Sequence, residues 1–290
     1  MTRIGFIGLG IMGAPMAAHL ATAGHQVIGH IRRPEAGQRL IAAGGTTATS
    51  IADTVADADV VITMLPNHPE VEQVVLGPDG VITRAPDNAL LIDMSTIRPE
   101  TAIRIADLGI RSLDAPVSGG QAGAENATLA IMVGGDADDV AYARPLFEVL
   151  GKTIVHVGPH GAGQTVKAAN QLVVGGIYAL VSEAIVLLEA SGVDPVAGLD
   201  VLAGGLAGSR ILDLKRASMI NREFTPGFRV DLHHKDMGIA IDAARQADVA
   251  LPVTGLVAQL MAAARAMGYG QLDHSALLRV VESLSGQGKG

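Results

Sequence analysis

The chain opens on the stretch T-R-I-G-F-I-G-L-G-I-M-G-A-P-M, residues 2–16. Its apolar run, residues 4–9, predicts a buried parallel strand, and the apolar residues that follow recur at helical spacing. Between them come three glycines in the order typical of a dinucleotide-binding turn: one makes the turn, one lets the backbone approach a pyrophosphate, and one lets helix and strand pack closely. The free amides and positive dipole of the helix start favour phosphate. We therefore expect the turn to bind a dinucleotide through Gly8, Gly10, Ile11, Met12 and Gly13.

The end of the next strand indicates which dinucleotide. Residues 26–31 predict this strand, and in a dinucleotide fold an acid at its end would hydrogen-bond the 2′-hydroxyl of NAD. Here the acid is missing, and Arg32 and Arg33 take its place. An arginine accommodates the 2′-phosphate of NADP. The sequence therefore predicts that NADP(H) is preferred and NAD(H) is possible, with solvated surface arginines as the alternative interpretation.

Two later apolar runs predict further buried parallel strands, at residues 59–65 and 89–94. The segments 64–66 and 93–96 then lie at carboxyl ends of strands, where ligands bind in open α/β sheets. Another strand follows from Leu113, leading into the sequence D-A-P-V-S-G-G. Its S-G-G part is typical of a turn, and its backbone N–H groups and serine hydroxyl can also form an anion-binding nest.

The sequence pattern changes from alternating strands and helices to helices alone after a glycine-rich segment at residues 158–164. From there the sequence predicts one helix of about 27 residues, about 40 Å long, and further helices to the end. We expect a Rossmann-like doubly wound α/β domain that binds NAD(P) over residues 1–161. An all-α domain for substrate binding and oligomerisation follows over residues 162–290, and a long interdomain helix joins the two.

Composition excludes several classes of protein. The 49% apolar residues suffice for a buried core, and the net charge of -8 argues against nucleic acid as a partner. The absence of cysteine removes disulfides, thiolate metal sites and cysteine nucleophiles, and no H-E-x-x-H motif accompanies the histidines, so we expect no metal. No signal peptide is visible, and the longest uncharged apolar stretch, residues 168–182, is too short to span a bilayer. We expect a cytoplasmic protein that binds no membrane.

A lysine in the first turns of the predicted long helix is the candidate acid/base. Lys167 has no acid near it in the sequence. Burial and a neighbouring positive charge lower the pKa of a lysine amine toward the neutral range, where it donates and accepts protons. Asn170 lies on the same helix face and can hydrogen-bond a substrate. The alternative is a lysine that merely extends from a core helix to solvent. A second pair, Lys235 and Asp236, begins another helix and is also consistent with a structural ion pair.

With these residues in view, the chain resembles the β-hydroxyacid dehydrogenase (3-hydroxyisobutyrate dehydrogenase-like) family, and within it the tartronate semialdehyde reductases (2-hydroxy-3-oxopropionate reductases). Four motifs of the family occur in the right order. They are G-F-I-G-L-G-I-M-G-A-P-M at 5–16, D-A-P-V-S-G-G at 114–120, G-x-x-G-x-G-x-x-x-K-x-x-N at 158–170, and H-K-D at 234–236. The resemblance implies the two-domain fold described above.

The resemblance also implies a role for each candidate residue. Lys167 would be the catalytic acid/base, and Asn170 would orient the substrate. The residues that would hold the substrate carboxylate are Ser118, Gly119 and Gly120. The residues that would bind the cofactor are Gly8, Gly10, Ile11, Met12, Gly13, Arg32, Arg33, Met64, Leu65, Pro66, Thr96, Phe228 and Lys235. Several members of the family carry a second Asn after the one at Asn170, whereas this chain has Gln171, as in the semialdehyde-reductase branch.

We therefore expect an NADPH-preferring oxidoreductase that transfers hydride between nicotinamide and a small anionic semialdehyde or 2-oxo acid to give a hydroxy acid. Gln121 and Asn126 stand where apolar or small residues are expected, and they leave the preferred substrate open. The alternatives are an imine reductase, although that group replaces the catalytic lysine, and an NAD-dependent 3-hydroxyacid dehydrogenase. A non-catalytic dinucleotide-binding interaction module is the alternative from another class. The apolar helical domain favours a homodimer or homotetramer.

Overall fold

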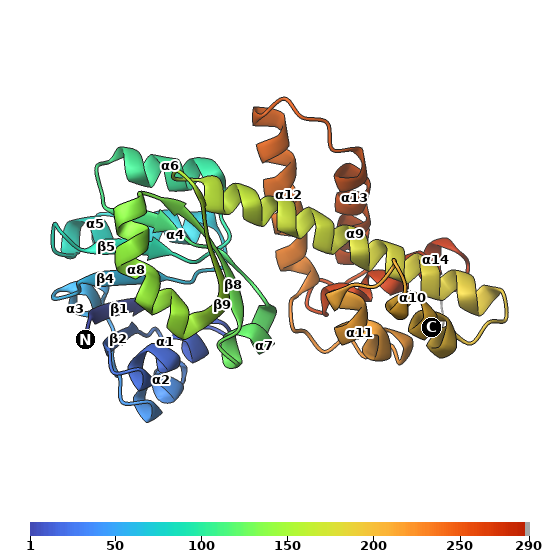
Figure 1. Cartoon of the computed structure of the whole chain (residues 1–290), viewed down its shortest axis with the longest axis horizontal. Coiled ribbons are helices and arrows are strands. Elements are labelled where there is room, and N and C mark those ends of the chain that lie inside the picture. The colour runs from blue at the N-terminus through green and yellow to red at the C-terminus, as the bar shows by residue number, and fades with distance from the viewer. Residues whose placement is uncertain (288–290) are drawn as a thin grey trace. The chain divides into compact units, whose positions relative to one another are not determined.

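The computed structural model describes residues 1–287 and divides into two compact units, Met1–Lys167 and Ala168–Gly290. The first unit holds a β-sheet covered by helices, and the second is built from helices (Figure 1). This confirms the predicted architecture of a Rossmann-like sheet domain followed by a helical domain. The first unit ends in sequence at Lys167, inside a helix that continues into the second.

One nine-stranded sheet forms the centre of the first unit. Its strands lie in the order β3-β2-β1-β4-β5-β6-β8-β7, and β9 pairs with β8. All neighbours from β3 to β6 are parallel, so the chain crosses over between them through helices, as in a doubly wound fold. The strands are β1 (Arg3–Ile7), β2 (Gln26–His30), β3 (Thr46–Ala48), β4 (Val60–Thr63), β5 (Leu90–Asp93), β6 (Ser112–Asp114), β7 (Val117–Ser118), β8 (Leu129–Gly135) and β9 (Gly151–Gly158).

Helices cover both faces of this sheet. Phe6 and Ile7 are neighbours in β1 and point to opposite faces, where Phe6 packs with Met16 of α1 and Ile7 packs with Val71 of α4. Helices α1, α2, α7 and α8 belong to the first face, and α3 to α6 belong to the second. The helices are α1 (Gly13–Thr22), the 3₁₀ turn η1 (Pro34–Gly37), α2 (Gln38–Ala42), α3 (Ile51–Val55), α4 (His68–Leu76), α5 (Val81–Arg84), α6 (Pro99–Asp107), α7 (Gly120–Glu125) and α8 (Ala137–Leu150).

Two features of the sheet were not predicted. Strand β3 adds an edge to the sheet, and its sequence T-T-A gives no signal because it has no apolar run. Strand β8 runs antiparallel to β6 and β7, whereas the strands before it are parallel. An apolar strand has the same sequence pattern in either direction, so its direction has to come from the structure.

The second unit is organised around the long helix α9 (Ala162–Ala190). Tyr178 and Ile185 of α9 are buried with Met237 of α12 and Val257 of α13. By length and composition alone, this 29-residue helix would be long enough to cross a membrane, but its buried side makes it a core helix of this unit. The other elements are α10 (Pro195–Gly204), α11 (Arg210–Ile220), α12 (Val230–Gln246), α13 (Pro252–Ala266), η2 (His274–Ala276) and α14 (Leu277–Leu284).

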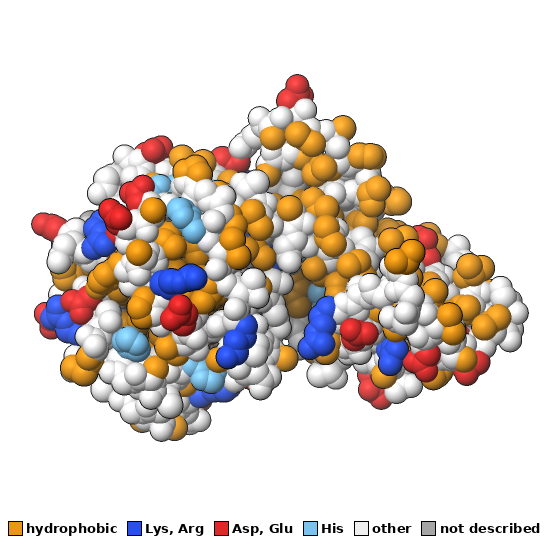
Figure 2. Space-filling model, viewed as in Figure 1, with side chains coloured by type: hydrophobic (Ala, Val, Ile, Leu, Met, Phe, Trp, Pro, Cys, Tyr) orange, Lys and Arg blue, Asp and Glu red, His pale blue; other side chains and the backbone are white. Residues whose placement is uncertain are grey.

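The opposite side of α9 carries exposed apolar side chains at intervals of seven residues, Val173, Leu180 and Leu187. Because seven residues make about two helical turns, the three side chains lie along one face of the helix. Figure 2 shows hydrophobic side chains exposed over the surface of this unit.

Candidate active site

The turn between β1 and α1 has the shape that a dinucleotide requires. Gly8 has a φ of +110°, and a Cβ there would lie 2.3 Å from the main-chain oxygen of Met64. A Cβ on Gly13 would lie 1.9 Å from the Gly8 oxygen, so only glycine lets α1 pack this closely on β1. At Gly10, by contrast, no heavy atom lies within 4 Å of the Cβ position. Open space beside a helix start is what a pyrophosphate needs, so the turn fits a dinucleotide cofactor.

The other expected cofactor residues of the first unit follow the carboxyl ends of the parallel strands. Arg32 and Arg33 follow β2 after one intervening residue, Ile31, and both arginine side chains are exposed. The loop after β4 is tied to the loop after β5, because the Leu65 amide donates to Ser95 Oγ at 2.8 Å. The remaining residues at these strand ends are exposed or half-buried, and they are Ile11, Met12, Met64, Pro66 and Thr96. The structure thus brings all of them to one edge of the sheet.

The S-G-G sequence spans the junction from β7 to α7. Ser118 is the last residue of β7, and the two glycines after it have φ values of +136° and +60°. These left-handed conformations favour glycine. A Cβ on Gly120 would meet no heavy atom within 4 Å, so the backbone of this turn is open to a ligand.

Lys167 lies beside this turn. Its side chain is buried, with 6% of its surface exposed, and its Nζ donates a hydrogen bond of 2.7 Å to the main-chain oxygen of Val117. Val117 directly precedes Ser118, so the hydrogen bond holds the amine next to the S-G-G turn. Two residues that lie 49 positions apart in sequence, Ser118 and Lys167, are therefore neighbours in space.

The start of α9 is held in place by two buried side chains. The carboxylate of Asp114 accepts hydrogen bonds from the Gly161 amide at 2.8 Å and the Gln164 amide at 2.9 Å. The Gln164 side chain in turn donates to the Ser95 oxygen at 2.8 Å and accepts from the Ile97 amide at 3.0 Å. These contacts fix the first turn of α9 against the loop after β5. They thereby fix the place of Lys167, three residues after Gln164.

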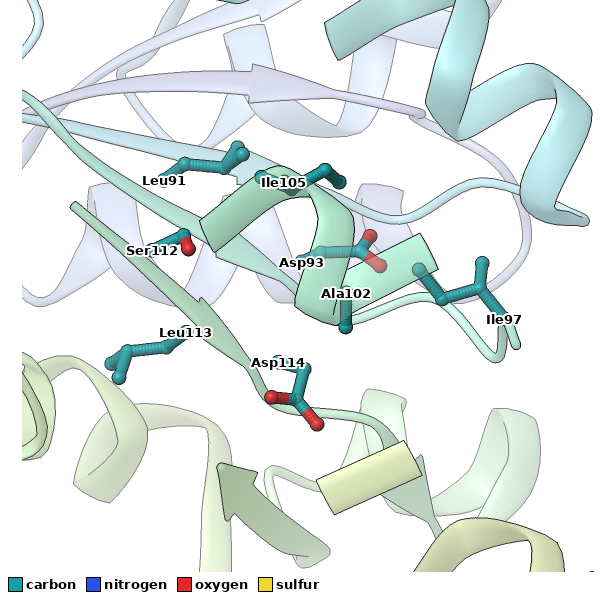
Figure 3. A pocket seen from close by; sticks show the side chains of 8 residues that line it. All are labelled: Leu91, Asp93, Ile97, Ala102, Ile105, Ser112, Leu113 and Asp114. Atoms are coloured by element: carbon teal, nitrogen blue, oxygen red, sulfur yellow. The ribbon is translucent and has the colours of Figure 1, made fainter. Parts of the chain in front are cut away.

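A second buried carboxyl, Asp93, lies beside Asp114. Both line a small cavity between β5, β6 and α6 (Figure 3). The volume of this cavity is about 10 Å³, which is enough for about one water molecule. Thr63 Oγ1 donates to Asp93 Oδ1 at 2.7 Å, while Asp93 Oδ2 and Ser112 Oγ have no hydrogen-bond partner within residues 1–287. Burial raises the pKa of Asp93 to about 6, the hydrogen bonds from Ser95 and Thr63 oppose the rise, and the charge of Asp114 adds to it.

In the helical unit, the expected site residues Asn170 and Lys235 belong to one chain of polar contacts. Asn170 Nδ2 donates to Gln171 Oε1 at 2.7 Å, and Gln171 Nε2 donates to Asp236 Oδ2 at 2.6 Å. The other oxygen of Asp236 lies 2.9 Å from Lys235 Nζ. Lys235 and Asp236 thus form an ion pair, which was one of the interpretations of their sequence. Gln171 connects this pair to Asn170.

Phe228 precedes α12 and is held by the turn around Asp273. The buried Asp273 carboxylate accepts from the amides of Gly227 at 2.8 Å and Phe228 at 3.2 Å, and it pairs with Lys215 Nζ at 2.9 Å. Burial raises the pKa of Asp273, but the His274 charge and the hydrogen bonds from Ser275 and Lys215 outweigh this effect and lower it to about 2. Asp273 therefore remains ionised and anchors the Phe228 loop.

Sequence reasoning assigned no role to several of these supporting residues, chiefly Asp114, Gln164 and Asp273. The available signal for Asp114 was its place inside a family motif, and the signal for Gln164 was its place three residues before Lys167. Asp273 gave no such signal, because Lys215, Gly227 and Phe228 lie tens of residues away in the sequence. Within residues 1–287, no three His, Cys, Asp or Glu side chains are grouped so as to hold a metal ion.

Comparison with known proteins places this geometry in a family. Residues 3–158 match the model of the NAD-binding domain of 6-phosphogluconate dehydrogenase. Residues 161–281 match the model described as the NAD-binding domain of NADP-dependent 3-hydroxyisobutyrate dehydrogenase. Together the two models cover nearly the whole described chain.

Individual relatives match over the same length. The chain is 42% identical over 287 residues to 2-hydroxy-3-oxopropionate reductase of Escherichia coli, covering 98% of each chain. It is 40% identical over 271 residues to 3-hydroxyisobutyrate dehydrogenase of Pseudomonas aeruginosa, covering 90% of this chain and 91% of the other. A solved structure of 3-hydroxyisobutyrate dehydrogenase from Mycobacterium tuberculosis with L-serine superimposes with a TM-score of 0.86 at 37% identity, over 97% and 99% of the two chains.

One conclusion follows from the glycine turn that fits a dinucleotide, the buried lysine beside the S-G-G turn, and the matches that extend over nearly the whole chain. The resemblance suggested by the four motifs is confirmed by the family models and by identities of 40% and above. The chain belongs to the β-hydroxyacid dehydrogenase family of NAD(P)-dependent oxidoreductases.

Proposed function

We propose that this enzyme is an NADPH-preferring reductase that converts a small anionic semialdehyde or 2-oxo acid to the hydroxy acid, as a tartronate semialdehyde reductase does. The observation that carries the proposal is the 2.7 Å hydrogen bond from Lys167 Nζ to the Val117 oxygen, because it holds a proton donor beside the S-G-G turn. The 42% identity to 2-hydroxy-3-oxopropionate reductase supports the substrate class.

The proposed reaction divides between hydride and proton transfer. When bound, the nicotinamide cofactor supplies the hydride that goes to the carbonyl carbon. Lys167, as an ammonium, gives a proton to the carbonyl oxygen as negative charge develops there, which completes the alcohol. The Ser118 hydroxyl and the amides of Gly119 and Gly120 hold the substrate carboxylate, and Asn170 orients the substrate.

The cofactor preference rests on Arg32 and Arg33. Both are exposed in the loop after β2, where two guanidinium groups would meet the 2′-phosphate of NADPH. We assign the pyrophosphate to the turn formed by Gly8, Gly10, Ile11, Met12 and Gly13. We assign the rest of the cofactor to Met64, Leu65, Pro66, Thr96, Phe228 and Lys235.

The proposed division of labour follows the two domains. Residues 1–161 form the domain that binds most of the cofactor, while residues 162–290 add Phe228 and Lys235, complete substrate binding and form a homodimer or homotetramer. The exposed apolar face of α9, with Val173, Leu180 and Leu187, supports oligomerisation because such a face is stabilised by burial. We propose a cytoplasmic enzyme that binds neither nucleic acid nor membrane, in keeping with its acidic charge and lack of cysteine.

A spectrophotometric assay of NADPH consumption tests this proposal. The panel contains tartronate semialdehyde, glyoxylate, succinic semialdehyde and a cyclic imine, each with NADPH and with NADH. The proposal requires turnover of a carboxylate-bearing aldehyde. Reduction of the cyclic imine alone would identify an imine reductase. A separate assay of NAD reduction with a 3-hydroxy acid, positive when no compound of the panel reacts, would identify a dehydrogenase. If no substrate reacts in either assay, the result favours the alternative of a non-catalytic dinucleotide-binding interaction module.

A further inference from the structure

Gln171 directly follows the expected substrate residue Asn170, and the structure buries it at a junction of hydrogen bonds. Only 4% of its surface is exposed. Its side chain bridges Asn170 and Asp236, and its main-chain oxygen lies 3.1 Å from Nε2 of His233. A buried polar network of this kind restricts the orientation of the side chains that it joins.

The chemistry of Asp236 sets the direction of the bonds through Gln171. An ionised carboxylate only accepts hydrogen bonds, so Gln171 must turn its Nε2 amide nitrogen toward Asp236. The oxygen of the same amide, Oε1, then faces Asn170 and accepts from Asn170 Nδ2. It follows that Asn170 turns its nitrogen toward Gln171 and its Oδ1 oxygen away from it.

A pair of buried histidines fixes the backbone side of Gln171. A main-chain oxygen can only accept, so Nε2 of His233 carries the proton in its contact with the Gln171 oxygen. The Nδ1 atoms of His233 and His274 lie 2.8 Å apart. At this distance the two Nδ1 atoms share one hydrogen bond. Because neutral His233 carries its proton on Nε2, its Nδ1 accepts and the Nδ1 of His274 donates.

The histidine pair also reaches the Phe228 loop. The His274 amide donates to the Phe228 oxygen at 2.8 Å, and the Phe228 ring lies edge-on to the His274 ring with centroids 5.3 Å apart. A Cβ on Gly175 of α9 would lie 3.2 Å from His233 Nε2, so the glycine gives the histidine room to approach α9. Continuous contacts therefore run from Phe228 through the histidines to Gln171.

We infer that Gln171 is a positioning residue, backed by Asp236 and His233, that fixes the Asn170 amide so that its Oδ1 is presented to the substrate. The inference rests on the proposed function, in which Asn170 orients the substrate. An amide oxygen is a hydrogen-bond acceptor, so the group that it recognises is an O–H donor on the substrate. The structure therefore favours a semialdehyde acid that carries a hydroxyl group over the same acid without one.

Two substrates isolate this hydroxyl group: tartronate semialdehyde has a 2-hydroxyl, and malonate semialdehyde differs only by lacking it. We expect the wild-type enzyme to favour tartronate semialdehyde by about tenfold or more in kcat/KM, the size of one net hydrogen bond. In Gln171→Met the side chain keeps its length but loses both bonds, so the preference falls to about parity. An asparagine at position 236 can donate as well as accept, so Asp236→Asn allows the hydrogen bonds through Gln171 and Asn170 to run in either direction. This variant therefore reduces the preference for the hydroxylated substrate in the same way.

Gln259→Met is the matched control, because Gln259 is an exposed residue on α13. It keeps the wild-type preference. NADPH titration followed by fluorescence checks that each variant still binds cofactor, and Asp236→Asn provides the answer if Gln171→Met does not fold. A wild-type enzyme without preference, or a Gln171→Met enzyme that keeps it, overturns the inference while the reductase function stands. A wild-type enzyme that reduces neither acid contradicts the proposed function itself.

Discussion

Asp93 and Asp114 occupy paired positions at the ends of two neighbouring parallel strands, β5 and β6, and both carboxyl groups are buried. Parallel partners in register point to the same face of the sheet, so the two acids share one environment. Asp114 anchors the start of α9, whereas Asp93 anchors the loop after β5 through Thr63 and Ser95. The two carboxyls together connect a cofactor loop to the helix that carries Lys167.

The burial of Asp93 predicts a stability that falls as pH rises. Its pKa is raised to about 6 in the folded protein, above the ordinary value of 3.8 that it regains on unfolding. The folded state therefore holds the extra proton between these two pH values, and the free energy of unfolding decreases as pH rises through this window. Two pKa units correspond to about 3 kcal/mol. Asp93→Asn should remove the Asp93 part of this decrease, which urea unfolding at pH 4.5 and 7.5 measures; burial also raises the pKa of Asp114, so the smaller part from that carboxyl remains. Asp87→Asn, at an exposed position, should keep it.

Two glycines of the first turn predict opposite outcomes for the same substitution. Gly10→Ala places a methyl group in open space, so the free energy of unfolding changes by less than about 1 kcal/mol, while NADPH affinity falls by about tenfold or more because the methyl group occupies the pyrophosphate position. Gly13→Ala drives a methyl group into the Gly8 oxygen and lowers stability by about 1–3 kcal/mol or more. Thermal unfolding and NADPH titration separate the two effects. Equal loss of stability in both variants would contradict this assignment.

Lys167→Ala should collapse turnover by about 10²- to 10⁴-fold, the usual contribution of a general acid. NADPH affinity should stay nearly unchanged, because the Lys167 amine contacts the Val117 oxygen rather than the glycine turn. Stopped-flow measurement of NADPH oxidation and a fluorescence titration give the two quantities. Lys152→Ala, on the exposed side of β9, is the matched control and should be active. Retention of most turnover in Lys167→Ala would remove the lysine from the mechanism.

The double variant Arg32→Ala/Arg33→Ala should lower the preference for NADPH over NADH by about tenfold or more, since it removes two partners of the 2′-phosphate. The affinity for NADH should change little, because NADH has no phosphate at that position. The kcat/KM values for both cofactors measure the preference. Arg144→Ala, on the exposed side of α8, serves as the control. A wild-type enzyme that already prefers NADH would contradict the role of both arginines.

Much of the fold followed from local patterns in the sequence. The apolar runs located β1, β2, β4 and β5, and the glycine break before residue 162 located the start of α9. The pattern could not give the direction of β8 or the presence of β3, because neither leaves a local signature. These features depend on which strands pair, and pairing is decided by packing over the whole unit.

The candidate site divides in the same way. Lys167, Ser118 and the first glycine turn stood in motifs whose spacing carries the chemistry, so the sequence named them. The residues that hold Lys167 in place were missed, because a partner such as Asp114 for the Gln164 amide lies 50 positions away. The polarity of such a contact depends on which atom faces which, and a sequence records residue types without their orientations.

The contacts of Gly8 and Gly13 have a consequence for how the cofactor is captured. The shape of the turn is fixed by protein atoms alone, the Met64 oxygen against Gly8 and the Gly8 oxygen against Gly13. The conformational entropy of this glycine turn is therefore lost when the chain folds and not when the cofactor binds. A preorganised turn of this kind binds the cofactor more tightly than a loop that makes the same contacts but must first become ordered. Cofactor exchange between turnovers would then require no refolding of this turn.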